Sequence, residues 1–440
     1  MFVMEERRET PVLGEYEVVV LGGGPAGIAA AAASGRAGRS TILVERYGFL
    51  GGAGTAAGLA NFCGLHARVH GEHRQVVHGI CDDILTRLER LGGLSPPHVL
   101  FNDRIQAQAY DISAYKIAAD ELLLSAEVKL LFHAFAVSAA RSKNEIEALI
   151  VETKSGRKAI LGGMFIDCSG DGDLAAWTGA PFEVGDGKGN MLYPSTMYRI
   201  GGVDPGKAGR AWERIPQLME EAEHSGRRFP RKKPIVRPQP NPTEWRANLT
   251  QIRNPDGTAV SGIDAEELAF GEVEGRRQVR DTFEFIREVT PGFERAYIAE
   301  IAPQIGIRET RRVRGEYLLT EDDVLDCVDF ADAIGVNGWP VEEHVAGNVD
   351  FRFQRKPRGY NQLPYRMIVP LGIDNLFVAG RCASMTHGGQ SAARVSGPCF
   401  VMGQAAGTAA HLALDGGIVP RALRIELLKK TLEADGAWLG

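Results

Sequence analysis

Residues 16–27 read Tyr-Glu-Val-Val-Val-Leu-Gly-Gly-Gly-Pro-Ala-Gly, an apolar run that ends in a cluster of glycines. The β-branched part, Tyr16 to Leu21, is typical of a buried parallel strand. The alanine-rich stretch from Gly27 to Ser34 predicts a helix, and the stretch from Thr41 to Val44 predicts a second strand. Together these segments predict a β-α-β unit and therefore an α/β fold.

The glycine cluster satisfies the spacing GxGxxG in this strand-to-helix context. Gly22 would allow the tight turn, Gly24 would let a pyrophosphate approach the backbone, and Gly27 would let the helix pack against the strand. Glu45 ends the second strand 23 positions after Gly22, where a carboxylate accepts hydrogen bonds from ribose hydroxyls. The pattern predicts a Rossmann-type dinucleotide-binding domain; the structural alternative is a plain turn with a solvated Glu45.

Three further glycine loops decide between NAD and FAD. One runs from Arg46 to Thr55, one from Asp167 to Asp173 after an apolar strand, and one begins at Gly380 after the strand Leu376 to Ala379. Simple NAD dehydrogenases do not need these loops, so they favour FAD; a flexible loop is the alternative at 46–55. The acids of 167–173 lack the spacing and terminal glutamate of an EF-hand, so we expect helix capping there and no metal site.

The order of the predicted elements divides the chain into two domains. A helix is expected from Gln106 to Leu124, and another from Gly397 to Leu414. A three-stranded antiparallel meander is expected from strands at Leu130–Ala139, Ile146–Thr153 and Lys158–Ile166. We expect a discontinuous FAD-binding domain (14–62, 104–184 and 366–440) and an inserted α+β substrate or cap domain (63–103 and 185–365).

Composition excludes several classes of protein. The net charge of −6 gives no global attraction to nucleic acid or to an anionic membrane, and no stretch approaches the roughly 20 apolar residues of a membrane-spanning helix. The charged N-terminus lacks the apolar core of a signal peptide. The six cysteines form neither CxxC nor CxxxxC, which argues against a dithiol reductase and fits unpaired thiols in the cytoplasm.

Four motifs in order give the chain a family resemblance: Leu50 to Thr55, Phe165 to Ala175, Gly306 to Leu318, and Pro364 to Arg394. The chain resembles the FAD-dependent oxidoreductases with a glutathione-reductase-type flavin fold. Ser169 replaces the usual threonine, and His387 to Arg394 departs from the expected motif. No histidine directly precedes Leu50, so the resemblance implies FAD that is bound non-covalently.

The resemblance implies a cofactor site assembled from all the glycine loops. Glu45 would hold the adenosine ribose, the meander at Ala136 and Val137 would contact adenine, and Gly380 with Arg381 would flank the ribitol. The N-terminus of the 397–414 helix would face the N1–C2=O edge of the flavin. The expected cofactor-binding residues are Gly22, Gly24, Pro25, Ala26, Gly27, Glu45, Arg46, Gly51, Gly52, Ala53, Thr55, Ala136, Val137, Ser169, Gly170, Asp171, Gly380, Arg381, Ser396 and Gly397.

Four residues are candidates for catalysis. His387 lies in a glycine-rich loop after the flavin strand, and imidazole titrates near neutral pH, so it is the first candidate for acid–base work; a structural histidine is the alternative. Arg311 belongs to the basic run from Arg308 to Arg314, which either binds a substrate carboxylate, stabilises reduced flavin, or forms a solvated or ion-paired face. Tyr365 and Arg394 are expected in the pocket, although Tyr365 also suits a packing role.

The sequence therefore predicts an FAD-dependent dehydrogenase. It would pass a hydride from a small polar substrate to N5 of FAD, and a separate electron acceptor would reoxidise the flavin. A monooxygenase that uses external NAD(P)H and oxygen, and a flavin electron-transfer component without a substrate, are the alternatives. A second GxGxxG for NAD(P)H is absent from the sequence. We expect no nucleic-acid or membrane partner, and assembly of identical chains is left open.

Overall fold

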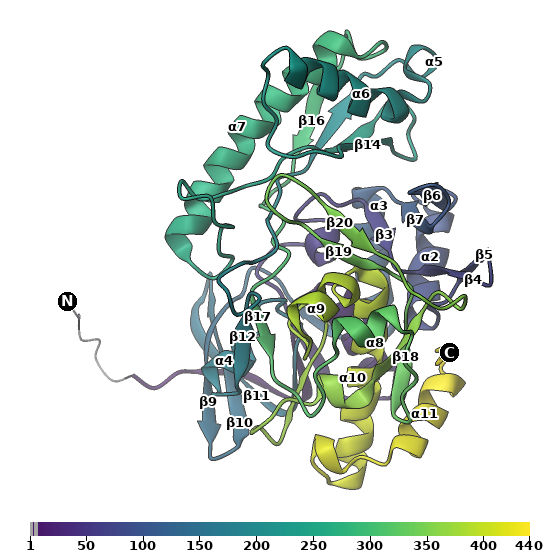
Figure 1. Ribbon diagram of the computed structural model, residues 1–440. Coiled ribbons are helices and arrows are strands. Elements are labelled where there is room, and N and C mark those ends of the chain that lie inside the picture. The colour runs from purple at the N-terminus through teal and green to yellow at the C-terminus, as the bar shows by residue number, and fades with distance from the viewer. Residues whose placement is uncertain (1–2, 4–7) are drawn as a thin grey trace.

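The computed structural model describes residue 3 and residues 8–440 of the chain. Part of the charged N-terminal stretch, for which we expect no signal peptide, lies outside the described residues. The chain forms a larger domain and a cap that stands on one side of it (Figure 1). Each has its own apolar core, and the core of the cap is built from residues between 198 and 296.

The larger domain is built on a seven-stranded mixed sheet in the order β8-β2-β1-β11-β10-β9, with β22 also paired to β11. β1 pairs in parallel with β2 and β11, whereas β9, β10 and β11 form the expected antiparallel meander. The strands are β1 (Val12–Leu21), β2 (Thr41–Val44), β8 (Lys129–Leu131), β9 (Phe135–Ser142), β10 (Glu145–Thr153), β11 (Gly156–Asp167) and β22 (Leu376–Val378). This arrangement confirms the α/β fold.

Two helices join the ends of the chain in one domain. The helix after the glycine turn, α1 (Pro25–Arg36), packs along α10 (Ser396–Gly416). Two glycines of α10 make this contact close: a Cβ on Gly403 would lie 2.0 Å from Ala26 O, and one on Gly407 would lie 2.2 Å from Ala30 O. The small residues of α10 therefore bring its first turn next to the glycine turn of β1 and α1.

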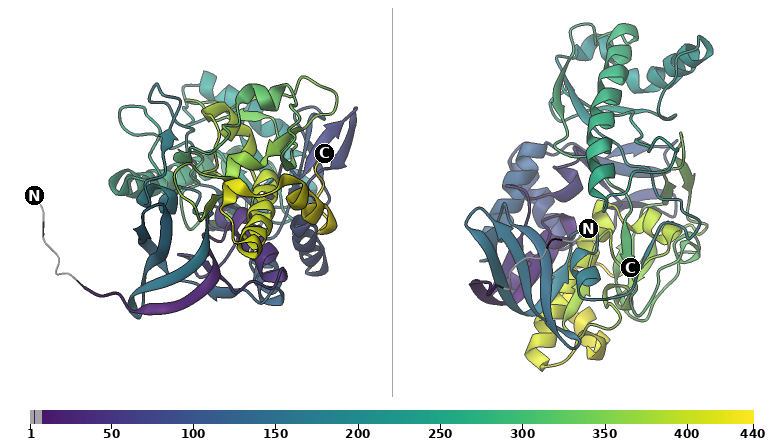
Figure 2. Two further views of the ribbon diagram at one scale, coloured as in Figure 1. Left: turned by 90° about the horizontal axis from the view of Figure 1, so that it is seen from below. Right: turned by 90° about the vertical axis from the view of Figure 1, so that its left-hand side faces the viewer.

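The cap is an antiparallel sheet covered on one face by helices (Figure 2). Its strands, in the order β14-β15-β13-β16, are β13 (Tyr198–Gly201), β14 (Ile235–Pro238), β15 (Trp245–Asn248) and β16 (Tyr297–Ile301). Its helices are α5 (Pro205–Ala208), α6 (Ala211–His224) and α7 (Ala265–Val289). The apolar face of the sheet packs on the helices through side chains such as Tyr198, Trp245 and Phe285.

The residues predicted for the cap divide between the two cores. Buried side chains of 63–103, such as Leu65 and Ile84, belong to the core of the larger domain, as do Val313 and Leu363. The elements here and in the remaining connections are β3 (Asn61–Cys63), β4 (His66–Val69), β5 (Glu72–Gln75), α2 (Ile80–Arg90), β6 (His98–Leu100), β7 (Ile105–Ala109), α4 (Asp173–Trp177), β12 (Phe182–Val184), β17 (Arg311–Val313), α8 (Glu321–Leu325), β18 (Ala333–Asn337), β19 (Val341–Glu343), β20 (Asp350–Arg352), β21 (Asn361–Pro364), α9 (His387–Ala393) and α11 (Ile425–Ala434).

Two predicted elements differ most from the structure. The helix expected from Gln106 begins as α3 (Ile112–Ser125), because Asp111 caps it by accepting from Ala114 N and the preceding residues pair as β7. The strand expected over 130–139 is split into β8, which extends β2 in parallel, and β9 of the meander. His133 lies between them at a φ of 52°, and this left-handed conformation interrupts the strand.

Candidate active site

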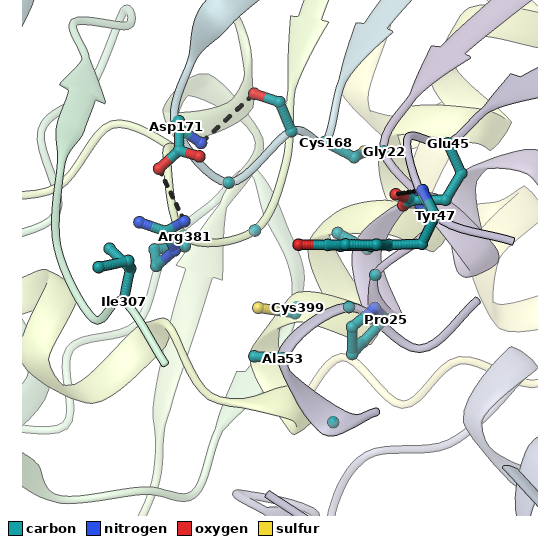
Figure 3. A pocket seen from close by; sticks show the side chains of 18 of the residues that line it. Gly22, Pro25, Glu45, Tyr47, Ala53, Cys168, Asp171, Ile307, Arg381 and Cys399 are labelled. Atoms are coloured by element: carbon teal, nitrogen blue, oxygen red, sulfur yellow. Dashed lines mark hydrogen bonds and ion pairs between the residues drawn. The ribbon is translucent and has the colours of Figure 1, made fainter. Parts of the chain in front are cut away.

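A cavity of about 440 Å³ lies where the glycine turns of the larger domain meet the cap. Its walls include the β1–α1 turn, the loops after β2, β11 and β22, the first turn of α10, and residues 304–307 from the segment that leaves the cap. Figure 3 shows Tyr47 extending into this space and Asp171 facing Arg381. The size suits a small-molecule site, and its position between two domains is typical of one.

The three glycines of the GxGxxG motif are required for different structural reasons. Gly22 has a φ of 97°, and a Cβ there would lie 2.5 Å from Cys168 O. A Cβ on Gly27 would lie 1.8 Å from Gly22 O, so the protein's own packing excludes side chains at both positions. At Gly24, however, a Cβ would meet no protein atom closer than 3.7 Å, and φ is an ordinary −75°. The missing side chain at Gly24 therefore leaves room in the cavity rather than relieving a clash.

The first turn of α1 faces this room with its backbone donors. Its N-cap residue, Gly24, has no side chain to cap the helix, and the first turn carries no acidic residue. Such a helix end attracts a phosphate through its N–H groups and dipole. Glu45 lies beside the turn, where its carboxylate accepts from Gly23 N at 2.7 Å and from Tyr47 N at 3.0 Å. These features fit the pyrophosphate and ribose of a dinucleotide.

The second glycine loop is held against the first. Gly51 N donates to Gly23 O at 2.8 Å, and Thr55 Oγ1 donates to Leu50 O at 2.7 Å. A Cβ on Gly52 would lie 2.7 Å from the Cα of Gly24, so the two backbones touch. Gly51 and Thr55 fix the loop from behind, whereas Gly52 and Ala53 line the cavity.

The loops after β11 and β22 are joined by a charged network. Arg381 donates to Asp171 Oδ1 at 2.8 Å, and Arg311 pairs with Asp173 at 2.9 Å. Burial and the charges of Asp171 and Asp167 raise the pKa of Asp173 to about 6, against the opposing effect of Arg311. Asp167 caps α4 through Ala175 N at 3.0 Å, as the sequence predicts for an acid of this loop.

Most of the predicted cofactor residues line this one cavity. They are Gly22, Gly24, Pro25, Ala26, Glu45, Arg46, Gly52, Ala53, Ala136, Ser169, Gly170, Asp171, Gly380, Arg381 and Ser396. The other five lie behind its wall: Gly27, Gly51, Thr55, Val137 and Gly397. Gly397 packs so closely on β3 and its following turn that a Cβ would lie 2.2 Å from Gly64 O.

Only one of the four candidate catalytic residues, Arg394, lines the cavity. Tyr365 differs most from its expected place: it is 2% exposed inside the core, and its hydroxyl donates to Pro420 O at 2.9 Å. Its ring packs near Phe377, which gives it the packing role that the sequence left open. Arg311 reaches the edge of the site through Asp173 but does not itself line the cavity.

His387 begins α9, outside the cavity wall, and is held by two carboxylates. Its Nδ1 lies 2.9 Å from the buried Glu309, and its Nε2 lies 4.0 Å from Glu343. Burial alone would lower the pKa of His387, but the hydrogen bond and charge of Glu309, with the charge of Glu343, raise it above its ordinary value. Glu309 also accepts from Arg312 and from Leu192 N. These contacts hold His387 outside the cavity wall, without direct access to the cavity.

Several cavity residues were missed by the sequence analysis. Tyr47 and Arg46 both contact Gln304, which enters the wall from the cap connection. Asn61 comes from the short strand β3, and Tyr110 follows β7. The position of Tyr47 next to Arg46 in the second loop was a usable signal. Gln304 and Asn61 stand in no recognisable motif, because only the tertiary fold brings them to the site.

The family comparison matches nearly the whole chain. The model of the family described as FAD dependent oxidoreductase matches residues 17–432. The chain belongs to this family. The protein is therefore an FAD-dependent oxidoreductase, and the helix end, Gly24 and Glu45 described above fit its cofactor.

The fold is also similar to that of solved structures, at low identity. A geranylgeranyl bacteriochlorophyll reductase-like protein from Thermoplasma acidophilum is 12% identical, with a TM-score of 0.48 over 96% of this chain and 91% of that one. p-Nitrophenol 4-monooxygenase from Pseudomonas putida is 13% identical (TM-score 0.47, 96% and 88% covered). L-Proline dehydrogenase from P. horikoshii is 11% identical (TM-score 0.42, 96% and 99% covered). No curated protein sequence matches the chain.

Two further features bear on the class of site. In the part of the chain that the structure describes, no helix is long and apolar enough to cross a membrane. Within the same residues, no group of three or more His, Cys, Asp or Glu side chains is arranged to hold a metal ion. All six cysteines are unpaired.

Proposed function

We propose that this oxidoreductase is a dehydrogenase of a small polar substrate, with dissociable FAD as its oxidant. FAD would take up the hydride of a substrate C–H bond at N5, while a proton from the neighbouring substrate atom passes to water and a double bond forms. The two electrons would then leave to a separate acceptor. This reaction consumes no external reductant. Monooxygenation, in contrast, requires external NAD(P)H and oxygen.

The position of the cavity between the cap and the cofactor-binding turns supports this proposal. Its walls combine the glycine turns of the larger domain with Leu268, Glu272 and Gln304, which lie in α7 and in the connection after β16. A substrate enclosed by these residues is held between the cap and the cofactor turns. Tyr47 and Arg46 of the larger domain contact Gln304 of the cap connection, so these contacts link the two sides of the cavity.

Anaerobic reduction of the purified, FAD-loaded protein tests the proposal. A panel of small alcohols, amines and hydroxy acids is added without NAD(P)H, and the visible absorption of the flavin is followed. Bleaching by at least one compound supports a dehydrogenase. Reduction only by NAD(P)H, with oxygen uptake stimulated by an aromatic compound, would show a monooxygenase. A flavin that no small molecule reduces or perturbs would indicate an electron-transfer component.

A further inference from the structure

The cap sheet carries a row of arginines on one face. Arg246 of β15 stands directly opposite Arg237 of β14 on one side and Arg199 of β13 on the other. Arg199 in turn stands opposite Glu300 and pairs with it at 2.9 Å. Like charges directly opposite each other destabilise an antiparallel sheet. A row of this kind needs negative charge nearby, and the carboxylates of Glu300, Glu244 and Asp111 supply it to Arg199, at the end of the row.

This row faces the larger domain. Alternation along β15 sends Trp245 and Ala247 into the core of the cap and Arg246 to the other face. Arg246 Nη1 donates to Leu59 O at 3.2 Å, and Leu59 lines the cavity. Arg246 is 4% exposed, so its charge is held at the boundary between the two domains, out of bulk water.

Arg246 is poorly satisfied for a buried cation. Within the part of the chain that the structure describes, its one hydrogen bond is to Leu59 O, and its Nε is buried without a partner. Among the described residues it forms no ion pair with a carboxylate, and burial lowers its pKa. A guanidinium carries several N–H donors, and leaving them unpaired in the interior costs about 1–3 kcal/mol each.

Arg394, which lines the cavity, repeats this pattern. Arg394, at the end of α9, donates to Glu342 O at 3.3 Å and lies 3.9 Å from the Glu342 carboxylate, while its Nε is buried without a partner. Glu342 is already engaged by His344 at 3.1 Å and by Trp339 Nε1 at 2.9 Å. Arg394 therefore has only a distant, shared carboxylate.

Hydrogen bonds place the two arginines at the two ends of β3. Arg246 donates to Leu59 O, two residues before β3 begins. At the other end, Ser396 Oγ, two residues after Arg394, accepts from Cys63 N at 2.8 Å and donates to Cys63 O at 3.0 Å. Asn61, two residues earlier in β3, lines the cavity with an Oδ1 that is buried and without a donor. Arg394 and Asn61 thus bring an unpaired donor and an unpaired acceptor to the cavity, and Arg246 bonds to the cavity wall at Leu59.

An ordinary structural role does not account for this arrangement. Arg231 shows what a structural buried arginine looks like here: it donates to Lys232 O, Lys233 O and Asn248 Oδ1 at 3.0–3.3 Å. Arg246 and Arg394 have no such set of acceptors. Arginine is suited to planar oxyanions because its donors match both oxygens of a carboxylate or phosphate.

We propose that Arg246 and Arg394 bind an oxyanion of the substrate, a carboxylate or a phosphate, and that Asn61 accepts from a neighbouring substrate hydroxyl or amine. This inference rests on the proposed dehydrogenase function and names its substrate class. The group at Asn61 would then be the one that loses its proton when the adjacent C–H bond is oxidised. The cap sheet would set the distance between the oxyanion and that bond.

Binding to the oxidised, FAD-loaded protein tests this subsite without turnover. The probes are glycolate and glycerol 3-phosphate, each compared with its uncharged counterpart, ethylene glycol or glycerol. Dissociation constants come from the perturbation of the flavin spectrum and from the shift of the melting temperature. We expect at least one anion to bind at least tenfold more tightly than its uncharged counterpart; which anion binds distinguishes carboxylate from phosphate.

Variants assign that affinity to the two arginines. Arg246→Gln and Arg394→Gln should each weaken anion binding at least tenfold, and Arg246→Lys, which keeps the charge but loses the paired donors, should weaken it less. Arg280→Gln, an exposed arginine of α7, is the matched control and should leave binding unchanged. FAD content and melting temperature check that each variant is folded.

The outcomes separate this inference from the proposed function. Equal anion affinity in the wild type and in Arg246→Gln, or no binding of either anion, overturns the subsite. If only an uncharged substrate bleaches the flavin, the dehydrogenase stands and the subsite is lost. If the anions bind through both arginines but no substrate bleaches the flavin, the subsite stands and the dehydrogenase is lost.

Discussion

The two ends of the cavity differ in how the protein treats its own polar groups. At the glycine turns, Glu45 and Gly51 are tied to the backbone of Gly23, and Asp171 is tied to Arg381. Beside β3, the Nε atoms of Arg246 and Arg394 are buried without partners. The polar groups at the first end are already paired within the protein, so this end is ready to bind the cofactor's phosphates. The two arginines at the second end lack partners until an anion binds. The contrast indicates that stability and substrate recognition are separated along one cavity.

The largest effect is expected for substitutions in the glycine turn that holds the cofactor. Gly27→Ala places a Cβ 1.8 Å from Gly22 O, so it should lower the free energy of unfolding by at least about 2 kcal/mol and abolish FAD binding. Gly24→Ala meets no protein atom within 3.7 Å and should lose FAD while the melting temperature of the FAD-free protein hardly changes. Thermal unfolding and flavin content of the purified proteins measure both. A Gly24→Ala protein that retains full FAD would place the pyrophosphate elsewhere.

The next effect concerns the acid beside the turn. Glu45→Ala removes the acceptor for Gly23 N and Tyr47 N and the expected partner of the ribose. Because hydrogen bonds to charged groups contribute about 1.5–3 kcal/mol, FAD affinity should fall at least tenfold. Fluorescence titration of the FAD-free protein checks this. The exposed carboxylate of Glu72 provides the control, since Glu72→Ala should have no effect on FAD affinity.

The next prediction is a pH dependence and concerns His387, which lies outside the cavity wall. The pKa of His387 is raised in the folded protein by Glu309 and Glu343. The stability contributed by this pair is therefore fully present below the unfolded pKa of histidine, near 6.5, and is lost as the pH rises through the raised folded value.

Urea unfolding across this pH range tests the linkage. The difference between wild type and His387→Gln should be about 1–2 kcal/mol at acidic pH and should shrink at alkaline pH. A difference that grows with pH would show that the histidine is neutral in the folded state. The exposed His224→Gln is the control, and its difference from wild type should stay near zero.

The smallest effect is expected when the buried Arg246 is replaced. Arg246→Met replaces a buried, poorly paired cation by an apolar side chain of similar length, which is often neutral or stabilising. We expect the ligand-free protein to gain up to about 1 kcal/mol of stability while anion binding is lost. Chemical unfolding without added anion measures the gain. A loss of more than about 2 kcal/mol would mean that Arg246 is a structural residue.

The same contrast explains what the sequence could predict. The strand Thr41–Val44 matches its prediction, and the glycine loops were found because short local patterns specify tight turns. The row formed by Arg237, Arg246 and Arg199 was not found, because it depends on the register of strands that are far apart in sequence. Tyr365 was expected in the pocket from its place before the last strand, but the chain turns it into the core. Tight turns can be predicted from short sequence patterns, whereas contacts between domains cannot.

The most direct test of the divided cavity is a crystal structure of the FAD-loaded protein with glycolate or glycerol 3-phosphate. We expect the pyrophosphate over Gly24 at the first turn of α1 and the oxyanion between Arg246 and Arg394. An oxyanion bound away from both arginines, or FAD bound away from the Gly22–Gly27 turn, would contradict it.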